Sequence, residues 1–248
     1  MEGNGRIYGE KTFIDSESVK LFWNKNAKKD SSLKSVLLGY DFGENSAVLH
    51  NQKEAKIVLD FIGSGGGTKT ILDIGCGIGR WAYNLKPKIK KYDGIDFSEE
   101  FIQAANSNFK DFDEIKFYCM SAIDIDRTKL LKKYDVVVVT EVSMYINDDE
   151  LEKLYNFINL FTQKDSFLYI QDTTSLLETR LTLKDFDSIE LKTKYNAIYR
   201  TRTKYETLFE KYLPAFKLVA NGTELLLDKS SGAREETNAR YWCFRREL

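Results

Sequence analysis

The sequence predicts an α/β fold built around a parallel sheet. From about residue 70, short β-branched runs alternate with amphipathic segments, a pattern typical of strand and helix units that pack on such a sheet. The chain has 248 residues, and α/β domains of this length often remain undivided. Glycine and proline, at 15 and 2 residues, are too scarce for long flexible linkers.

Five strands and three helices are expected to alternate over the central part of the chain. The strands are predicted at residues 70–74, 92–95, 115–120, 134–140 and 167–171. The helices are predicted at residues 80–85, 98–108 and 148–161. In the second helix, Ser98 precedes Glu99 and Glu100, as is typical of an N-cap followed by acidic residues in the first turn.

Two segments interrupt this alternation. Residues 1–62 are expected to form an N-terminal cap with lid helices, among them a helix over 46–62, before a glycine-rich stretch at 63–67. Residues 63–248 would then form the main domain, with a substrate-lid insertion at about 173–213. Both additions are expected over the carboxyl edge of the sheet, where open α/β sheets bind ligands. Three closing strands are predicted at 216–220, 223–227 and 239–245, and the last two are able to form a hairpin.

Charge and cysteine content exclude several classes of protein. Lys plus Arg number 37 and Asp plus Glu number 38, so the net charge of −1 gives no footprint for nucleic acid or an anionic membrane surface. No apolar run approaches the ~20 residues that span a bilayer, and the N-terminus lacks the apolar stretch of a signal peptide. Three widely spaced cysteines without a C-x-x-C pair indicate a reduced, cytoplasmic protein and no metal site.

The most informative stretch follows the first predicted strand. An apolar run ends in Asp73 and leads into Gly75, Gly77 and Gly79, whose spacing allows the backbone to approach a ligand closely before a helix begins. The dinucleotide fingerprint places its third glycine one residue later, where this chain has Arg80. The spacing therefore disfavours a pyrophosphate ligand.

Two further signals lie at the ends of other predicted strands. Asp96 ends the second strand, and a carboxylate at this place accepts hydrogen bonds from both hydroxyls of a ribose. The buried strand at 134–140 ends in polar residues, Thr140 followed by Glu141. Together with the glycines, these residues indicate a cofactor that carries a nucleoside.

These stretches, taken in order, resemble the class I methyltransferases that use S-adenosylmethionine, over about residues 65–172. The resemblance implies a Rossmann-like three-layer sandwich. Its seven-stranded, mostly parallel sheet would have one antiparallel strand, which the closing hairpin would supply. The resemblance also implies that the three glycines line the methionine part of the cofactor, that Asp96 binds the ribose and that Phe97 lies against adenine.

Further cofactor-binding residues follow from the same resemblance. Asp73 belongs to this set, and Ser121 with Ala122 stands where the family usually has an acidic residue that recognises the adenine amino group. The ending Gly-Ile-Gly-Arg is similar to the protein N-terminal methyltransferases, in which the arginine pairs with the cofactor's carboxylate, here Arg80. An aromatic pair near the N-terminus would make Trp23 a lid over the cofactor. Where those enzymes have a catalytic histidine, this chain has Tyr145, so their substrate is not carried over.

Three residues are candidates for the catalytic group. Glu141 stands where a strand end points into the crevice, although it could instead orient the following loop. Tyr145 could contact the methyl donor, because aromatic faces attract a sulfonium, or could be a core residue. His50 is the only histidine and is either a base or a helix-surface imidazole.

The second interrupting segment contains the candidate substrate-binding residues. It interleaves cations with aromatics, and such side chains grip a phosphate or carboxylate. A solvated helix start is the competing interpretation. The candidates are Tyr195, Tyr199, Arg200 and Arg202.

The sequence therefore predicts a methyltransferase that moves a methyl group from S-adenosylmethionine to an oxygen or nitrogen of a small polar acceptor. An anionic acceptor, such as a sugar or a phosphorylated precursor of a surface polysaccharide, is favoured, and no metal is required. Neither nucleic acid nor a membrane is expected as a partner, and the sequence predicts no oligomeric state. The alternatives are a nicotinamide-dependent oxidoreductase and a non-catalytic module that binds the cofactor to regulate a partner.

Overall fold

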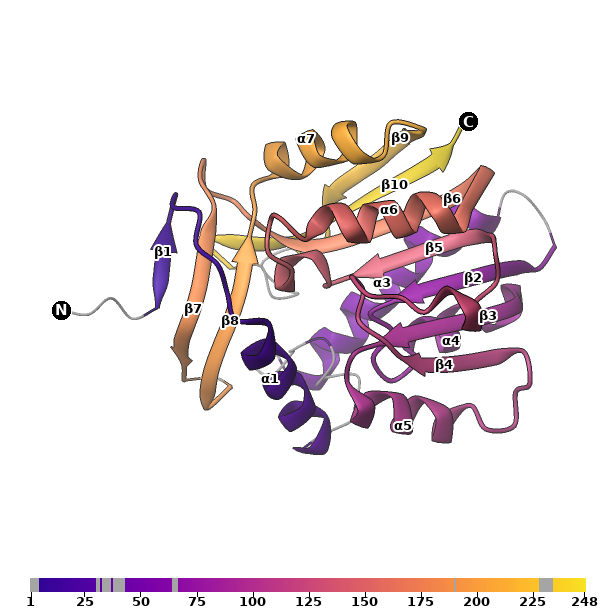
Figure 1. The fold of residues 1–248 in the computed structure, drawn as a ribbon, viewed down its shortest axis with the longest axis horizontal. Coiled ribbons are helices and arrows are strands. Elements are labelled where there is room, and N and C mark those ends of the chain that lie inside the picture. The colour runs from indigo at the N-terminus through magenta and orange to yellow at the C-terminus, as the bar shows by residue number, and fades with distance from the viewer. Residues whose placement is uncertain are drawn as a thin grey trace.

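A computed structural model describes residues 5–29, 32, 37, 43–63, 67–189, 191–227 and 234–248. Most of the glycine-rich stretch, residues 64–66, lies outside these ranges. The described chain folds around one large sheet with helices on both faces and a second, smaller sheet at one end (Figure 1).

Within the described residues, the large sheet has seven strands in the order β4-β3-β2-β5-β6-β10-β9. Their bounds are β2 (Lys69–Ile74), β3 (Ile89–Asp96), β4 (Ile115–Cys119), β5 (Tyr134–Thr140), β6 (Thr162–Ser175), β9 (Phe216–Leu225) and β10 (Thr237–Arg246). The first five run parallel, whereas β10 is antiparallel to both β6 and β9. The predicted mostly parallel sheet with one reversed strand is confirmed, and the closing hairpin supplies that strand. The prediction of two separate strands at 216–220 and 223–227 was wrong, because the single strand β9 runs from Phe216 to Leu225.

Helices cover both faces of this sheet and make the predicted three-layer sandwich. Their bounds are α3 (Gly43–Gly63), α4 (Arg80–Leu85) and α5 (Glu99–Asn108) on one face, and α6 (Leu151–Phe161) and α7 (Arg202–Tyr212) on the other. Alternation along β5 explains the two cores. Val136 and Val138 pack with α3 and α4, whereas Val137 and Val139 pack with α6 and α7. The predicted N-cap is present, since the Ser98 hydroxyl accepts a hydrogen bond from the amide of Phe101.

The segment predicted as a substrate lid, about 173–213, contains three different structures. Its first residues complete β6. The strands β7 (Leu181–Ser188) and β8 (Thr193–Tyr199) form a separate antiparallel sheet with β1 (Arg6–Tyr8). Residues 202–212 form α7, which buries Tyr205, Leu208 and Phe209 against the large sheet. The lid prediction is therefore wrong for α7, which belongs to a helical layer.

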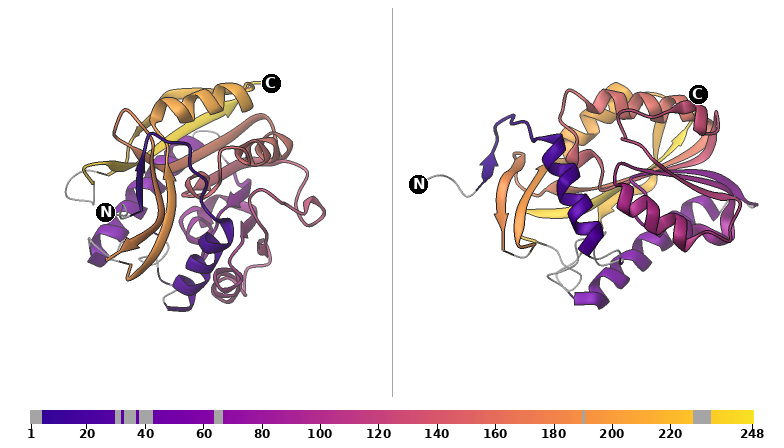
Figure 2. Two further views of the ribbon diagram at one scale, coloured as in Figure 1. Left: turned by 60° about the vertical axis from the view of Figure 1, so that its left-hand side comes forward. Right: turned by 60° about the horizontal axis from the view of Figure 1, so that its bottom comes forward.

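The N-terminal segment also divides into parts with different positions. Helix α1 (Ser16–Lys29) and the small sheet lie beside the carboxyl ends of the parallel strands (Figure 1, Figure 2). By contrast, α3 packs on the large sheet and contributes Ala55, Val58 and Ile62 to its core. The division of the chain at residues 62 and 63 stays a prediction.

A tight turn joins β2 to α4 and ends at Gly79, which has a φ of 86°. This left-handed conformation favours glycine. A Cβ added here would lie 2.7 Å from a ring carbon of Phe109 and 2.9 Å from one of Phe117. Gly79 therefore allows α4 to begin directly against the aromatic core.

We expect Gly79→Ala to lower the free energy of unfolding by about 2–4 kcal/mol, because it combines backbone strain with overpacking. Urea denaturation would measure the loss. Gly63→Ala is the matched control, since a Cβ at Gly63 meets nothing within 4 Å. Equal stability of the two variants would contradict this account of the turn.

Candidate active site

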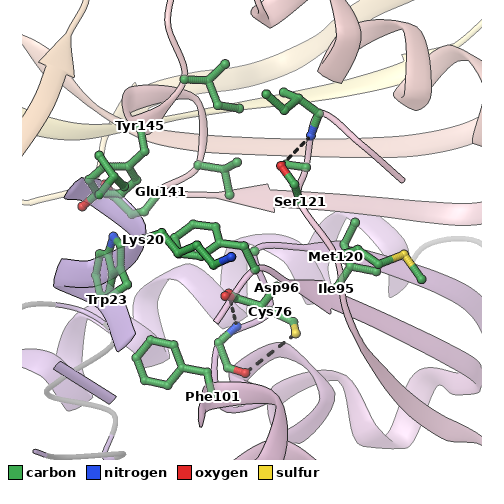
Figure 3. A pocket seen from close by; sticks show the side chains of 18 of the residues that line it. Lys20, Trp23, Cys76, Ile95, Asp96, Phe101, Met120, Ser121, Glu141 and Tyr145 are labelled. Atoms are coloured by element: carbon green, nitrogen blue, oxygen red, sulfur yellow. Dashed lines mark hydrogen bonds between the residues drawn. The ribbon is translucent and has the colours of Figure 1, made fainter. Parts of the chain in front are cut away.

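A cavity of about 410 Å³ lies at the carboxyl ends of β2, β3, β4 and β5, with α1 along one wall. Figure 3 shows Trp23, Glu141 and Tyr145 gathered at one end, called here the Glu141 end. Met120 and Ser121 lie at the other, the Met120 end. Its size and its mixed polar and apolar walls suit a small organic ligand.

The glycine turn forms the floor between the two ends. The amides of Gly75 and Cys76 both donate to the carbonyl oxygen of Ile95, at 2.8 and 3.0 Å. Gly75 has a φ of 82°, and a Cβ there would collide with the side chain of Val142. The absence of a side chain therefore lets the turn pack directly against Val142 while its backbone lines the cavity.

Asp96 lines the cavity between the two ends (Figure 3). Its carboxylate accepts hydrogen bonds from the amides of Gly77, at 3.0 Å, and Ser98, at 2.8 Å. Burial raises its pKa to about 6, and these amides oppose the rise. The carboxylate is thus held in one orientation and is ionised at pH 7, as acceptance of hydrogen bonds from sugar hydroxyls requires.

Arg80 reaches the cavity from the first turn of α4. Its Nη1 donates to Glu54, at 2.7 Å, and to Asn51, at 3.2 Å. Its Nη2 donates to the hydroxyl of Thr140 at 3.3 Å. The guanidinium also stacks on Trp81, with its Cζ 4.5 Å from the ring centroid. A cationic group is therefore fixed in the cavity wall.

Glu141 follows directly after β5 and has a φ of 55°, a strained conformation for a non-glycine residue. Gln171 donates to its carboxylate at 2.5 Å and Thr173 at 3.0 Å. Burial raises the pKa of Glu141 to about 7, the nearby charge of Asp172 adds to the rise, and the two hydrogen bonds oppose it. A carboxyl group with this pKa is suited to proton transfer at neutral pH.

Aromatic side chains enclose the Glu141 end. Trp23 of α1 packs edge-on against Tyr145, with ring centroids 5.5 Å apart. The hydroxyl of Tyr145 is 2.6 Å from that of Tyr195, which lies behind it on β8 and is buried. The small sheet therefore supports the wall of the cavity without lining it.

Ten of the residues singled out from the sequence line this cavity. They are Trp23, Gly75, Gly77, Arg80, Asp96, Phe97, Ser121, Ala122, Glu141 and Tyr145. Apart from Trp23 of α1, they lie at the end of a parallel strand or in the segment that follows one, and these strands end at one edge of the sheet.

Three other predicted residues lie outside the cavity wall. Asp73 is fully buried beneath the turn, where it accepts a hydrogen bond from Tyr92. Gly79 faces the aromatic core, as described above. His50 is buried on α3, with its Nε2 3.8 Å from Glu54, and burial lowers its pKa to about 4. Asp73 and Gly79 therefore do not line the cavity as expected, and His50 is neither a cavity residue nor a helix-surface imidazole.

The substrate-binding prediction also needs correction. Arg200 is fully buried and donates to Asp148 and to the carbonyl oxygens of Ser143 and Ile146, each at 2.7 Å. It therefore anchors the loop that carries Tyr145. Arg202 is exposed on α7 and pairs with Glu206. Tyr199 and Tyr195 are buried in the small sheet and likewise do not line the cavity.

Two residues of the site were missed from the sequence, one in the cavity wall and one behind it. Met120 follows the same rule as Asp96, because it stands just beyond the end of a parallel strand, and that rule could have found it. Glu54 is a buried carboxylate on α3 that contacts Arg80. An acidic residue on the otherwise apolar face of the helix was the available signal.

Comparison with known proteins identifies the central part of the chain. Residues 71–163 match a family model described as a methyltransferase domain. These residues therefore form a methyltransferase domain, and solved S-adenosylmethionine-dependent methyltransferases have the same fold. This methyltransferase domain includes the glycine turn, Asp96 and Glu141.

One curated relative is the phosphoethanolamine N-methyltransferase 1 of Triticum aestivum, 25% identical over 168 residues. The alignment covers 67% of this chain and 32% of the relative, so the chain spans about a third of that protein's length.

Two solved structures show the same fold as the methyltransferase domain and its surroundings. A Leishmania major S-adenosylmethionine-dependent methyltransferase has a TM-score of 0.67 and 16% identity, with 99% of this chain and 98% of that chain covered. The phosphoethanolamine N-methyltransferase 1 of Haemonchus contortus, in complex with phosphoethanolamine and S-adenosylhomocysteine, has a TM-score of 0.66 and 17% identity. In that comparison 94% of this chain and 49% of that chain are covered.

The residues of the cavity fit the cofactor of this class. Gly75 and Gly77 line the cavity with backbone alone, Asp96 offers an oriented carboxylate and Arg80 offers a fixed cation. In turn, these three groups suit the thioether, the ribose and the carboxylate of the cofactor. Among the described residues, no group of three or more His, Cys, Asp or Glu side chains could hold a metal ion. No helix in the described ranges is long and apolar enough to cross a membrane.

We expect Asp96→Asn to weaken binding of S-adenosylhomocysteine about 10–100-fold, because charge-assisted hydrogen bonds to a sugar contribute roughly 1.5–3 kcal/mol each before water compensates. In the wild type, affinity should fall as the pH drops below about 6, since protonation of Asp96 removes an acceptor. Calorimetry would measure both effects.

The control for this prediction is Asp113→Asn, which alters a fully exposed carboxylate away from the cavity and should leave affinity unchanged. Identical affinities for Asp96→Asn and Asp113→Asn would remove Asp96 from the ribose site.

Proposed function

We propose that the protein transfers a methyl group from S-adenosylmethionine to a nitrogen or oxygen of a small polar acceptor. The proposal rests on one observation: a single cavity connects the glycine turn and Asp96 to the Glu141 end. A carboxylate with a pKa of about 7 and aromatic walls stand there, beyond the groups that suit the cofactor.

The chemistry asks little of the protein beyond positioning. When bound, the cofactor would supply a methyl group on a sulfonium: the acceptor would bond to the methyl carbon in line with the carbon–sulfur bond, which breaks and releases S-adenosylhomocysteine. Trp23 and Tyr145 exclude water from the Glu141 end. Glu141 takes the proton that the acceptor loses, and Gln171 and Thr173 hold its carboxylate in place.

The pKa of Glu141 favours nitrogen over oxygen as the acceptor atom. Proton transfer is most efficient between groups of similar pKa. The pKa of an ammonium group is much closer to 7 than that of an aliphatic hydroxyl. The relatives named above, phosphoethanolamine N-methyltransferases, support the same choice. They also support an acceptor with an anionic group, although Arg200 and Arg202 are engaged elsewhere and do not supply its partner.

A two-stage experiment tests the function. Calorimetry first measures binding of S-adenosylhomocysteine, which should be tight. Transfer of labelled methyl is then measured over phosphoethanolamine, ethanolamine, phosphocholine precursors and sugar phosphates, with the product identified by mass. Binding without transfer to any acceptor would instead favour the non-catalytic module, and absent binding would overturn the cofactor site.

Once an acceptor is known, we expect Glu141→Gln to lower kcat by about 10²–10⁴-fold, the usual contribution of a general base. Cofactor affinity should change little. In the wild type, kcat should rise tenfold per pH unit up to about pH 7 and then level off, because only ionised Glu141 accepts the proton.

Glu152→Gln serves as the control because Glu152 is exposed on α6, away from the cavity. A wild-type rate for Glu141→Gln, or an unchanged pH profile, would eliminate Glu141 as the base.

A further inference from the structure

Glu54 is a buried acid that the proposed function leaves without a role. It lies on α3, outside the residues matched by the methyltransferase family model, and its side chain is fully buried. A buried carboxylate is costly unless both oxygens have partners. Oε1 accepts from the hydroxyl of Tyr169 at 3.0 Å, and Oε2 accepts from Nη1 of Arg80 at 2.7 Å. Both oxygens are therefore satisfied.

Glu54 forms its ion pair with Arg80 and not with His50. His50 is one helical turn away, 3.8 Å from Oε2, but its lowered pKa keeps it neutral at pH 7. Asn51, on the same helix, accepts from the same Nη1 of Arg80 at 3.2 Å and is itself held by Asn84 at 2.7 Å. Two side chains of α3 thus define where this guanidinium lies.

The restraint leaves one edge of the guanidinium available. A guanidinium carries five N–H groups. Glu54 and Asn51 occupy Nη1, and Thr140 takes one hydrogen from Nη2. Within the described part of the chain, the Nε–H and the second Nη2 hydrogen have no acceptor. Arg80 lines the cavity and Glu54 does not, so α3 holds the guanidinium from behind.

We propose that Glu54 is a positioning residue. It fixes Arg80 so that the remaining N–H groups of the guanidinium bind the carboxylate of the cofactor's amino-acid tail. The inference rests on the cofactor named in the proposed function and extends the binding site to α3. A guanidinium with rotamer freedom would lose entropy on binding, whereas this one is already ordered. Glu54 therefore acts on the tail alone, not on the nucleoside.

Two ligands separate the tail from the nucleoside. S-adenosylhomocysteine carries the amino-acid tail, and 5′-methylthioadenosine has the same nucleoside and sulfur without it. We expect Glu54→Gln to weaken binding of S-adenosylhomocysteine at least tenfold and to change binding of 5′-methylthioadenosine less than twofold. Asp60→Asn makes the same change to an exposed acid on the same helix and should affect neither ligand.

A double-mutant cycle distinguishes positioning from a general structural role. Arg80→Met should weaken S-adenosylhomocysteine binding as much as or more than Glu54→Gln. In the Arg80→Met background, Glu54→Gln should cause less than a twofold further loss. Equal losses for both ligands, or full additivity of the two substitutions, would overturn the proposal.

A second variant covers the case in which Glu54→Gln does not fold. Asn51→Ala removes the other acceptor of Nη1 without leaving a charge unpaired, and it should weaken S-adenosylhomocysteine binding several-fold while sparing 5′-methylthioadenosine. No difference between the ligands would again overturn the role of α3. Failure of the wild type to bind S-adenosylhomocysteine would overturn the cofactor itself, so the two failures are distinguishable.

Discussion

The carbonyl oxygen of Ile95 accepts hydrogen bonds from two consecutive amides, those of Gly75 and Cys76, and the cavity depends on this contact. It holds the glycine turn against the end of β3, so that the next residue, Asp96, meets the amide of Gly77. Two backbone hydrogen bonds and one from a backbone amide to the carboxylate thereby place the turn and the carboxylate relative to each other. Gly75 must lack a side chain because Val142, two residues beyond the end of β5, fills the same space.

Buried acids give the cavity its electrostatic character. In the cavity wall, burial raises the pKa of Glu141 to about 7 and that of Asp96 to about 6. Beneath the turn, burial also raises the pKa of Asp73 to about 7. A site that keeps carboxylates partly desolvated attracts a cation, because a positive ligand restores the stabilisation that water gave. The sulfonium of the cofactor meets this requirement, and Arg80 offsets the charge of Glu54 nearby.

Local chemistry explains which features could be predicted from the sequence. The glycine spacing and Asp96 were found because a turn against a ligand restricts both residue type and position. Pairing with partners distant in the chain was not visible. In the sequence, Arg200 looks like a surface cation beside aromatic residues. In the structure it donates hydrogen bonds to Asp148, 52 residues earlier, and to two carbonyl oxygens of the loop.

The elements of the insertion show the same limit. Residues 202–212 carry a helical apolar face, but only packing on β10 reveals that α7 belongs to the helical layer, where Tyr205 and Phe209 meet Trp242. The strands β7 and β8 pair with each other, but they form a three-stranded sheet only with β1, which comes from the other end of the chain, and this sheet was missed. Glu54 was missed because its partner Arg80 follows it by 26 residues on another helix.

The hydrogen bond between Tyr145 and Tyr195 has an evolutionary consequence. The Met120 end is built from the parallel strands, whereas the wall at the Glu141 end is backed by a small sheet that shares no strand with them. Substitutions within β7 and β8 can reshape that wall while the glycine turn stays intact. Such separation lets a lineage exchange one acceptor for another without having to rebuild how it holds the methyl donor.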